Sequence, residues 1–215
     1  MPRLAQRNRP HDRQHPWTWE MEMEMDLGRS PESVIGYDSS PCWGDLKEIK
    51  TDDYKQKNPN GLLPAVKIED ESYYESGAIM QIILERFANG KLMPAANTKQ
   101  RGKFLQWLWF LEATFTPHLS ELHHHKMVLP DDKKVPEVIP YEEEVADQRM
   151  QVVEDQLSKA HYLLGEDFTA VDIVCGQVLT LAEEMEVMKP RSHPASHKYL
   201  EEMKGRPGYA KAVAH

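Results

Sequence analysis

The chain of 215 residues is 40% hydrophobic and 28% charged, a composition typical of folded proteins. Its 26 basic and 35 acidic residues give a formal net charge of −9, which argues against a nucleic-acid-binding surface. No run of eighteen apolar residues is present, so we expect no membrane-spanning helix. Cys42 and Cys175 are too few for a disulfide framework or a zinc site, and the opening residues do not resemble a secretion signal. We therefore expect a cytoplasmic protein without a metal.

Residues 1–30 differ from the rest of the chain. Three prolines interrupt an arginine-rich stretch up to residue 19, and a short alternation of acidic residues and methionines follows. Such a pattern is compatible with strand, helix and low-complexity sequence. We predict a divergent, poorly specified segment here.

Residues 45–95 show a regular order of elements. Asp45 to Lys57 is polar and predicts a surface connection, and Asn58 to Gly61 is a strong turn signal. An apolar run, an acidic turn and a second short strand ending at Tyr74 predict an antiparallel hairpin. A helix is expected from Ser76 to the Asn-Gly pair that follows its last apolar residue.

After Pro94 the apolar residues recur at helical spacing to the end of the chain. The spacing predicts helices over residues 97–127, 141–164, 169–188 and 197–204. The third of these is apolar almost all round, which is typical of a buried central helix. The predicted fold is therefore a small α/β domain over residues 31–94 followed by an all-α helical-bundle domain over residues 97–215.

Pro64 and Ser76 indicate a peptide-binding site. Pro64 lies within a strand-like run, where a trans proline would remove a ladder hydrogen bond. A cis Leu63–Pro64 bond resolves this conflict and leaves the main chain of Leu63 to pair with an extended peptide. Ser76 begins the next helix and offers a hydroxyl and free N–H groups to a carboxylate. Each feature alone is common in ordinary turns and helix caps, but together they fit a small peptide such as glutathione.

Five motifs follow one another from residue 58 to residue 207. They are Asn58-Pro-Asn-Gly-Leu-Leu-Pro-Ala, Glu75-Ser-Gly-Ala-Ile, Leu92-Met-Pro, Phe168-Thr-Ala-Val-Asp-Ile and the segment from Tyr199 to Pro207. In this combination residues 45–215 resemble the glutathione S-transferase family. The resemblance implies a thioredoxin-like first domain, an all-helical second domain and a cytoplasmic homodimer that takes part in detoxification.

The resemblance also implies a site and a reaction. Leu63 and Pro64 would bind the cysteinyl part of glutathione, and Glu75 and Ser76 would hold its γ-glutamyl end. This chain has Leu62 where the family frequently has a basic residue or glutamine, so the glycyl carboxylate would lose a contact. The implied function is conjugation of the glutathione thiol to a small hydrophobic electrophile, with glutathione as co-substrate and no metal.

Two further sets of residues lie in the helical half. Trp107, Phe110, Thr114 and His118 share one face of the predicted helix over residues 97–127, and in the family this helix lines the pocket of the electrophile. Packing in the core or at a dimer interface explains the same spacing. Thr169 and Asp172 match a helix capping box and are expected to hold the fold.

No residue is assigned to activation of the thiol. Ser40 and Cys42 superficially match the family's motif, but Asn58 follows Cys42 by only 58 − 42 = 16 positions. A helix, a strand and two loops need roughly thirty residues, so we expect the first strand and helix within residues 1–35. A second interpretation therefore stays open: a non-catalytic binding or assembly module with this fold, as in translation elongation factor 1 gamma.

Two other features receive structural interpretations. His123, His124 and His125 point around a helix and have no evident partner carboxylate, so a solvated helix end is predicted rather than a metal site. Cys175 lies on the predicted buried helix and is expected to be inert.

Overall fold

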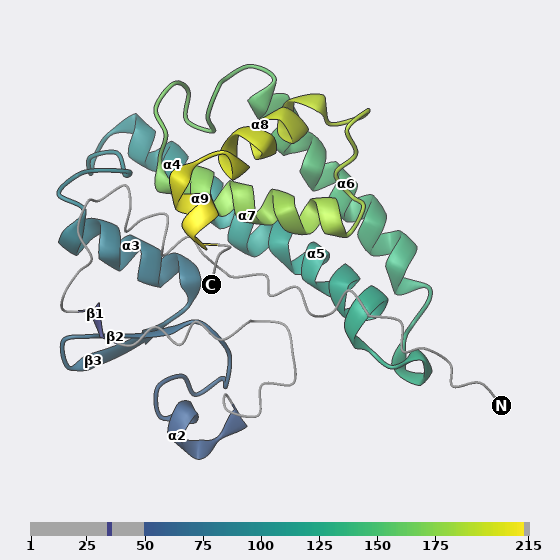
Figure 1. Cartoon of the computed structure of the whole chain (residues 1–215), viewed down its shortest axis with the longest axis horizontal. Helices are drawn as coiled ribbons and strands as arrows, with labels where there is room; N and C mark the ends of the chain where they lie inside the picture. Colours follow the sequence, from purple (N-terminus) through teal and green to yellow (C-terminus); the bar gives the residue numbers. More distant parts are fainter. Residues whose placement is uncertain (1–33, 36–49, 213–215) are drawn as a thin grey trace.

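The computed structural model describes residues 34–35 and 50–212. Their elements follow one another in the order β1 (Val34–Ile35), α2 (Asp52–Lys55), β2 (Ala65–Ile68), β3 (Glu71–Tyr74), α3 (Ser76–Phe87), α4 (Lys99–Trp109), the π-helix η3 (Phe110–Phe115), α5 (Thr116–His123), the π-helix η4 (His124–Val128), the 3-10 helix η5 (Asp131–Lys133), α6 (Val138–Leu157), α7 (Ala170–Glu184), α8 (Pro194–Lys204) and α9 (Pro207–Ala212). Figure 1 shows a small sheet with α3 beside it and a larger group of helices. Among the described residues, no helix is long and apolar enough to cross a membrane.

The sheet confirms the predicted hairpin. β2 and β3 are antiparallel, with Ala65 opposite Tyr74 at one end and Ile68 opposite Glu71 next to the turn. The short strand β1 pairs antiparallel with the other edge of β2. The segment before the hairpin was expected to be a plain connection, but it contains α2, whose N-cap Thr51 accepts a hydrogen bond from the Tyr54 N–H.

The long helix predicted over residues 97–127 is interrupted by two π-helical segments. In η3, Thr116 N–H donates to the carbonyl of Leu111, five residues back instead of four. Pro117 follows in the first turn of α5. Because proline has no N–H, the carbonyl of Ala113 has no donor at the usual position. A π segment accommodates this interruption without ending the helix, but it rotates the residues beyond it relative to those before it.

The ends of α6 and α8 differ from the predicted ones. α6 was expected to continue to residue 164 but ends at Leu157, and the buried Leu163 lies in the loop that follows. α8 begins earlier than predicted because the buried carboxylate of Glu154 accepts from the N–H groups of Ala195 (2.9 Å) and Ser196 (2.8 Å). A carboxylate at a helix N-terminus satisfies donors that the helix itself leaves free. The short α9 was not predicted.

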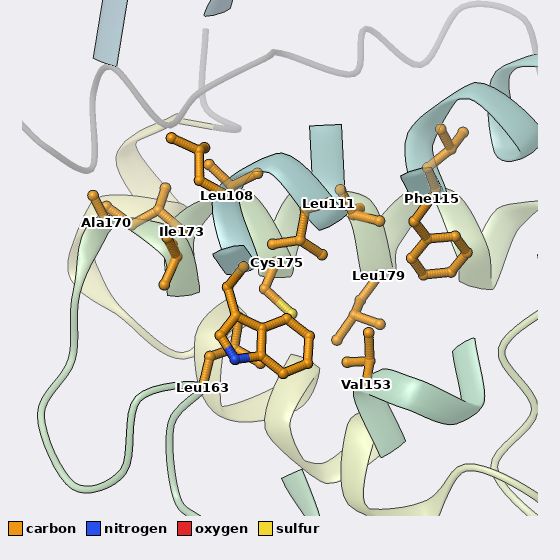
Figure 2. Packing of buried hydrophobic residues seen from close by; sticks show 14 of the residues in the cluster. Leu108, Leu111, Phe115, Val153, Leu163, Ala170, Ile173, Cys175 and Leu179 are labelled. Carbon is orange, nitrogen blue, oxygen red and sulfur yellow. The ribbon is translucent and has the colours of Figure 1, made fainter. Parts of the chain in front are cut away.

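α7 is the predicted central helix. Eleven of its residues are buried, and α4, η3, α5 and α8 contact it. Figure 2 shows Leu108 and Leu111 packing towards Ile173, Cys175 and Leu179. The same apolar cluster continues through α3 into β2, so the sheet and the helices share one core. A hydrogen bond from the Ala170 N–H to the Leu92 carbonyl (2.8 Å) also joins the two halves.

Candidate functional site

The hairpin register brings the four predicted glutathione-binding residues to one place. Ala65 is opposite Tyr74 in the pair farthest from the turn, where Leu63 and Pro64 directly precede Ala65 and Glu75 and Ser76 directly follow Tyr74. This end of the hairpin is the one away from its turn, where β3 passes directly into α3. Residues separated by eleven or more positions in the sequence therefore gather at a single end of the sheet.

Leu63 is held by the segment that precedes it. The Leu62 carbonyl accepts from the Tyr54 hydroxyl (2.9 Å) and from Asn58 Nδ2 (2.6 Å), and the Leu63 side chain packs on Tyr54 and Ala65. Within the described part of the chain, the N–H and C=O of Leu63 make no hydrogen bond. The predicted cis Leu63–Pro64 peptide bond is confirmed. The main chain next to Leu63 is thus held in place by two hydrogen bonds, and its pairing with a bound peptide stays a prediction.

Ser76 begins the twelve-residue helix α3, and its hydroxyl donates to Glu112 Oε1 at 3.1 Å. Glu112 comes from η3 in the helical half, 36 positions further along the chain. Glu112 packs beside Gly77: a Cβ atom placed on Gly77 would lie 3.8 Å from Cγ of Glu112, which is ordinary van der Waals contact. No pattern in the sequence points to Glu112, because its contact with Ser76 depends on how the two halves pack.

Burial raises the pKa of Glu112 above its usual value. The hydrogen bond from Ser76 opposes this effect, whereas the nearby carboxylate of Glu75 adds to it. Glu75 itself is exposed and has a backbone φ of 74°, which is uncommon for a residue with a side chain. The helix start therefore combines free N–H groups, one hydroxyl and two carboxylates.

Comparison with known proteins identifies the family. The model of the glutathione S-transferase N-terminal domain matches residues 27–91, and that of the glutathione S-transferase C-terminal domain matches residues 115–207. The chain belongs to the glutathione S-transferase family. The predicted combination of a thioredoxin-like half and a helical half is confirmed, while the domain limits at residues 31–94 and 97–215 stay a prediction.

Relatives and solved structures support this assignment over most of the chain. Glutathione S-transferase F9 of Arabidopsis thaliana is 27% identical over 85% of this chain and 87% of its own. The disulfide-bond oxidoreductase YfcG of Escherichia coli is 28% identical over 73% of each chain. The glutathione transferase URE2P6 of Phanerochaete chrysosporium, solved with oxidized glutathione, has a TM-score of 0.76 at 24% identity and covers 90% of this chain and 88% of its own. This likeness shows the shared fold.

The four residues predicted to line the electrophile pocket of this transferase-family chain do not form a continuous face. Trp107 is buried in the core and meets Phe110 edge-on, with ring centroids 5.5 Å apart. Thr114, within the π segment, is exposed, and His118 beyond it turns to α6, where its Nδ1 lies 2.6 Å from Glu142 Oε2. The π-helical turn changes the helix phase that the predicted spacing assumed. A role in binding an electrophile stays a prediction.

The predicted capping box of α7 is present. Asp172 Oδ2 accepts from the N–H (2.8 Å) and hydroxyl (3.0 Å) of Thr169, and Oδ1 accepts from the Leu163 N–H and the Tyr199 hydroxyl (both 2.9 Å). Burial raises the pKa of Asp172, and these hydrogen bonds oppose the rise. Burial also raises the pKa of the Cys175 thiol well above its usual value, which agrees with the prediction that this cysteine is inert.

The prediction of a solvated helix end is wrong for His125, which is buried, whereas His124 is exposed and His123 is half-buried. The Nδ1 of His125 accepts from the Val135 N–H (3.2 Å), and its Nε2 lies 3.2 Å from Oε1 of Glu121. Glu121 is four positions earlier along the chain, a spacing that brings two side chains together on a helix, and it is the partner carboxylate of His125. The acceptor role of Nδ1 fixes a proton on Nε2 and identifies His125 as an anchor for the loop that leads to α6.

One other group of potential metal ligands occurs in the described part of the chain. Ligand atoms of Glu183, His197 and Glu201 lie within 4.8 Å of one another. Lys204 Nζ lies 2.9 Å from the Glu183 carboxylate and 3.0 Å from that of Glu201. The ammonium group already supplies the positive charge that these carboxylates require.

Residues 1–30 and the candidates Ser40 and Cys42 lie outside the described residues. The expected first strand and helix within residues 1–35 fall there as well, except for β1. No thiol-activating residue is assigned within the described part of the chain.

Proposed function

We propose that this protein binds glutathione along Leu63 and Pro64 and at Glu75 and Ser76, and adds its thiol to a small hydrophobic electrophile. The observation that carries the proposal is the gathering of these four residues at one end of the hairpin, next to the start of α3. An extended peptide pairing with Leu63 would run towards the N–H groups of that helix, which favour a carboxylate. Relatives named glutathione S-transferases support the same assignment.

The reaction needs a thiolate, which is the nucleophilic form of the thiol. With an aryl halide, the sulfur forms a bond to the ring carbon, halide leaves with the electron pair of the broken bond, and the thiol proton passes to solvent. A homodimeric state, a cytoplasmic location and a role in detoxification belong to the same proposal as expectations from the family.

The competing proposal is a non-catalytic binding or assembly module with the same fold. The support for this second proposal is that thiol activation is assigned to no residue in the described part of the chain. Retention on immobilised glutathione, followed by a conjugation assay with an aryl halide, separates the two. Retention with turnover supports the transferase, retention without turnover supports the binding module, and loss of both contradicts the proposed site.

Ser76→Ala tests the site directly. Removal of the hydroxyl takes away a hydrogen bond to a charged ligand group, which is worth about 1.5–3 kcal/mol, so we expect retention to be lost. Ser72→Ala is the matched control because Ser72 is exposed on β3 and lies outside the proposed site. Full retention of the folded Ser76→Ala protein would contradict the proposal.

A further inference from the structure

The ends of α7 and α8 bring together three side chains of the kinds that bind transition metals. Glu183 lies in the last turn of α7, and His197 and Glu201 lie on α8. A nitrogen or oxygen atom from each of the three lies within 4.8 Å of the others. His197 and Glu201 are four positions apart, a spacing that places two side chains on one face of a helix. The group therefore combines one imidazole with two carboxylates from two helices.

Contacts between α7 and α8 hold these ligands in place. The Tyr199 hydroxyl donates to Asp172 Oδ1 at 2.9 Å, and a Cβ atom placed on Gly176 would lie 3.6 Å from Cβ of Met203. Positions 176 and 183 are seven residues apart, so this close contact lies on the same face of α7 as Glu183. The two helices are thus fixed relative to each other, and only small side-chain rotations are needed to close the ligand set around an ion.

The separations fit a zinc ion. His197 Nε2 lies 3.9 Å from Glu183 Oε1. Two ligands of a tetrahedral zinc ion are ~3.3 Å apart, given the usual bond lengths from zinc to nitrogen and oxygen. The two atoms therefore need to approach each other by less than an ångström.

A cation of the protein itself already lies between the two carboxylates. Lys204 Nζ is 2.9 Å from Glu183 Oε2 and 3.0 Å from Glu201 Oε1. Both carboxylates also lie in the last turns of their helices, where the aligned peptide dipoles favour positive charge. Ion pairs that are open to solvent contribute little. A divalent ion that gains the imidazole as a third ligand is therefore able to displace the ammonium group.

We propose that Glu183, His197 and Glu201 bind a divalent transition metal of the zinc type, which displaces Lys204. An imidazole ligand favours zinc over magnesium, because magnesium prefers carboxylate and water ligands. Three protein ligands leave the fourth tetrahedral position to water, and the ion links α7 to α8. None of the three residues belongs to the proposed glutathione site, so the binding of the ion does not depend on that function.

Titration calorimetry of the full chain with zinc chloride tests the site, in buffer without glutathione because thiols bind zinc themselves. We expect a binding step that an equal concentration of magnesium chloride does not displace. His197→Ala should weaken this step about tenfold or more, since the loss of a group that merely orients a metal ligand already costs about 10–100-fold. The matched control is His161→Ala, because His161 lies 3.9 Å from a single carboxylate, that of Glu202. This control should leave the step unchanged.

Lys204→Leu tests the displacement. Leucine offers no charge and no donor atom, so zinc binding should become about threefold tighter or more once the competing ammonium group is gone. Unchanged zinc binding by the folded His197→Ala protein would overturn the inference, and so would the absence of zinc binding by the wild type. Displacement of zinc by magnesium would show an unspecific group of carboxylates and overturn it as well. Unchanged or weaker zinc binding by Lys204→Leu would contradict the competition with Lys204.

Discussion

Glu75 combines an unusual backbone conformation with a position at the glutathione site. Its φ of 74° and ψ of 113° lie outside the regions that residues with side chains prefer. Such conformations cost of the order of 1–3 kcal/mol and are often retained for function. Glycine removes that cost. It also raises the conformational entropy of the unfolded chain, which lowers stability by about 0.4–1 kcal/mol. We expect Glu75→Gly to raise the free energy of unfolding by up to about 2.5 kcal/mol while retention on glutathione falls, as measured by urea denaturation and by affinity chromatography.

Glu69→Gly is the control for this prediction. Glu69 is exposed in the hairpin turn and has a φ of 57°, so it shares the backbone feature but not the site. Its replacement should leave glutathione retention unchanged. If Glu75→Gly were retained as strongly as the wild type, the Glu75 side chain would have no part in binding.

At the scale of single residues, the sequence predicted what depends on neighbours along the chain. Pro64 within a strand-like run predicted the cis bond, and the motif from Glu75 predicted where α3 begins. Glu112 could not be predicted, because its contact with Ser76 joins positions 36 residues apart. Tyr54 was missed for a related reason: a tyrosine in a polar stretch does not reveal that its hydroxyl holds the carbonyl of Leu62.

Among the secondary-structure elements, α7 depends most clearly on one buried carboxylate. Asp172 accepts four hydrogen bonds with two oxygens, whereas asparagine has one acceptor oxygen and would turn its NH₂ group towards other donors. Leaving two buried donors unpaired costs about 1–3 kcal/mol each. We expect Asp172→Asn to lower the free energy of unfolding by about 3 kcal/mol or more, as measured by urea denaturation followed by circular dichroism.

The pH dependence of this loss has a definite sign. Burial raises the pKa of Asp172 in the folded state above its ordinary value of 3.8, so the folded protein binds this proton more tightly than the unfolded chain. The contribution of Asp172 to stability therefore falls as the pH rises above 3.8. The difference in free energy of unfolding between the wild type and Asp172→Asn should become smaller over the same range. Asp167→Asn, at an exposed position in the preceding loop, should change stability by less than about 0.5 kcal/mol at every pH. A deficit that widened with pH would contradict this assignment.

Helical periodicity predicted the elements that are regular and failed where a helix changes its phase or its end. The buried helix α7 and the hairpin follow directly from their apolar patterns. The spacing from Trp107 to His118 assumed a uniform helix, which Pro117 and the π segment interrupt. Leu164 continued the apparent pattern of α6, but it packs against the core from a loop that Asp172 holds through the N–H of Leu163. The spacing of apolar residues indicates which side chains are buried. It does not distinguish a buried residue in a loop from one in a helix.

On the scale of the whole molecule, Leu108 links the two halves through their common core. It is fully buried on α4, its Cδ1 lies 3.8 Å from the position of a Cβ on Gly77 in α3, and it packs towards Ile173 of α7 (Figure 2). Leu108→Ala should lower the free energy of unfolding by about 2–5 kcal/mol. Because one core serves both halves, we expect hydrogen exchange to show α3 and α7 losing amide protection together. Val152→Ala, at an exposed position of α6, should leave the amide protection of α3 and α7 unchanged. Loss of protection in α3 with full protection in α7 would show that the halves open independently and that the site at their junction forms only when they are docked.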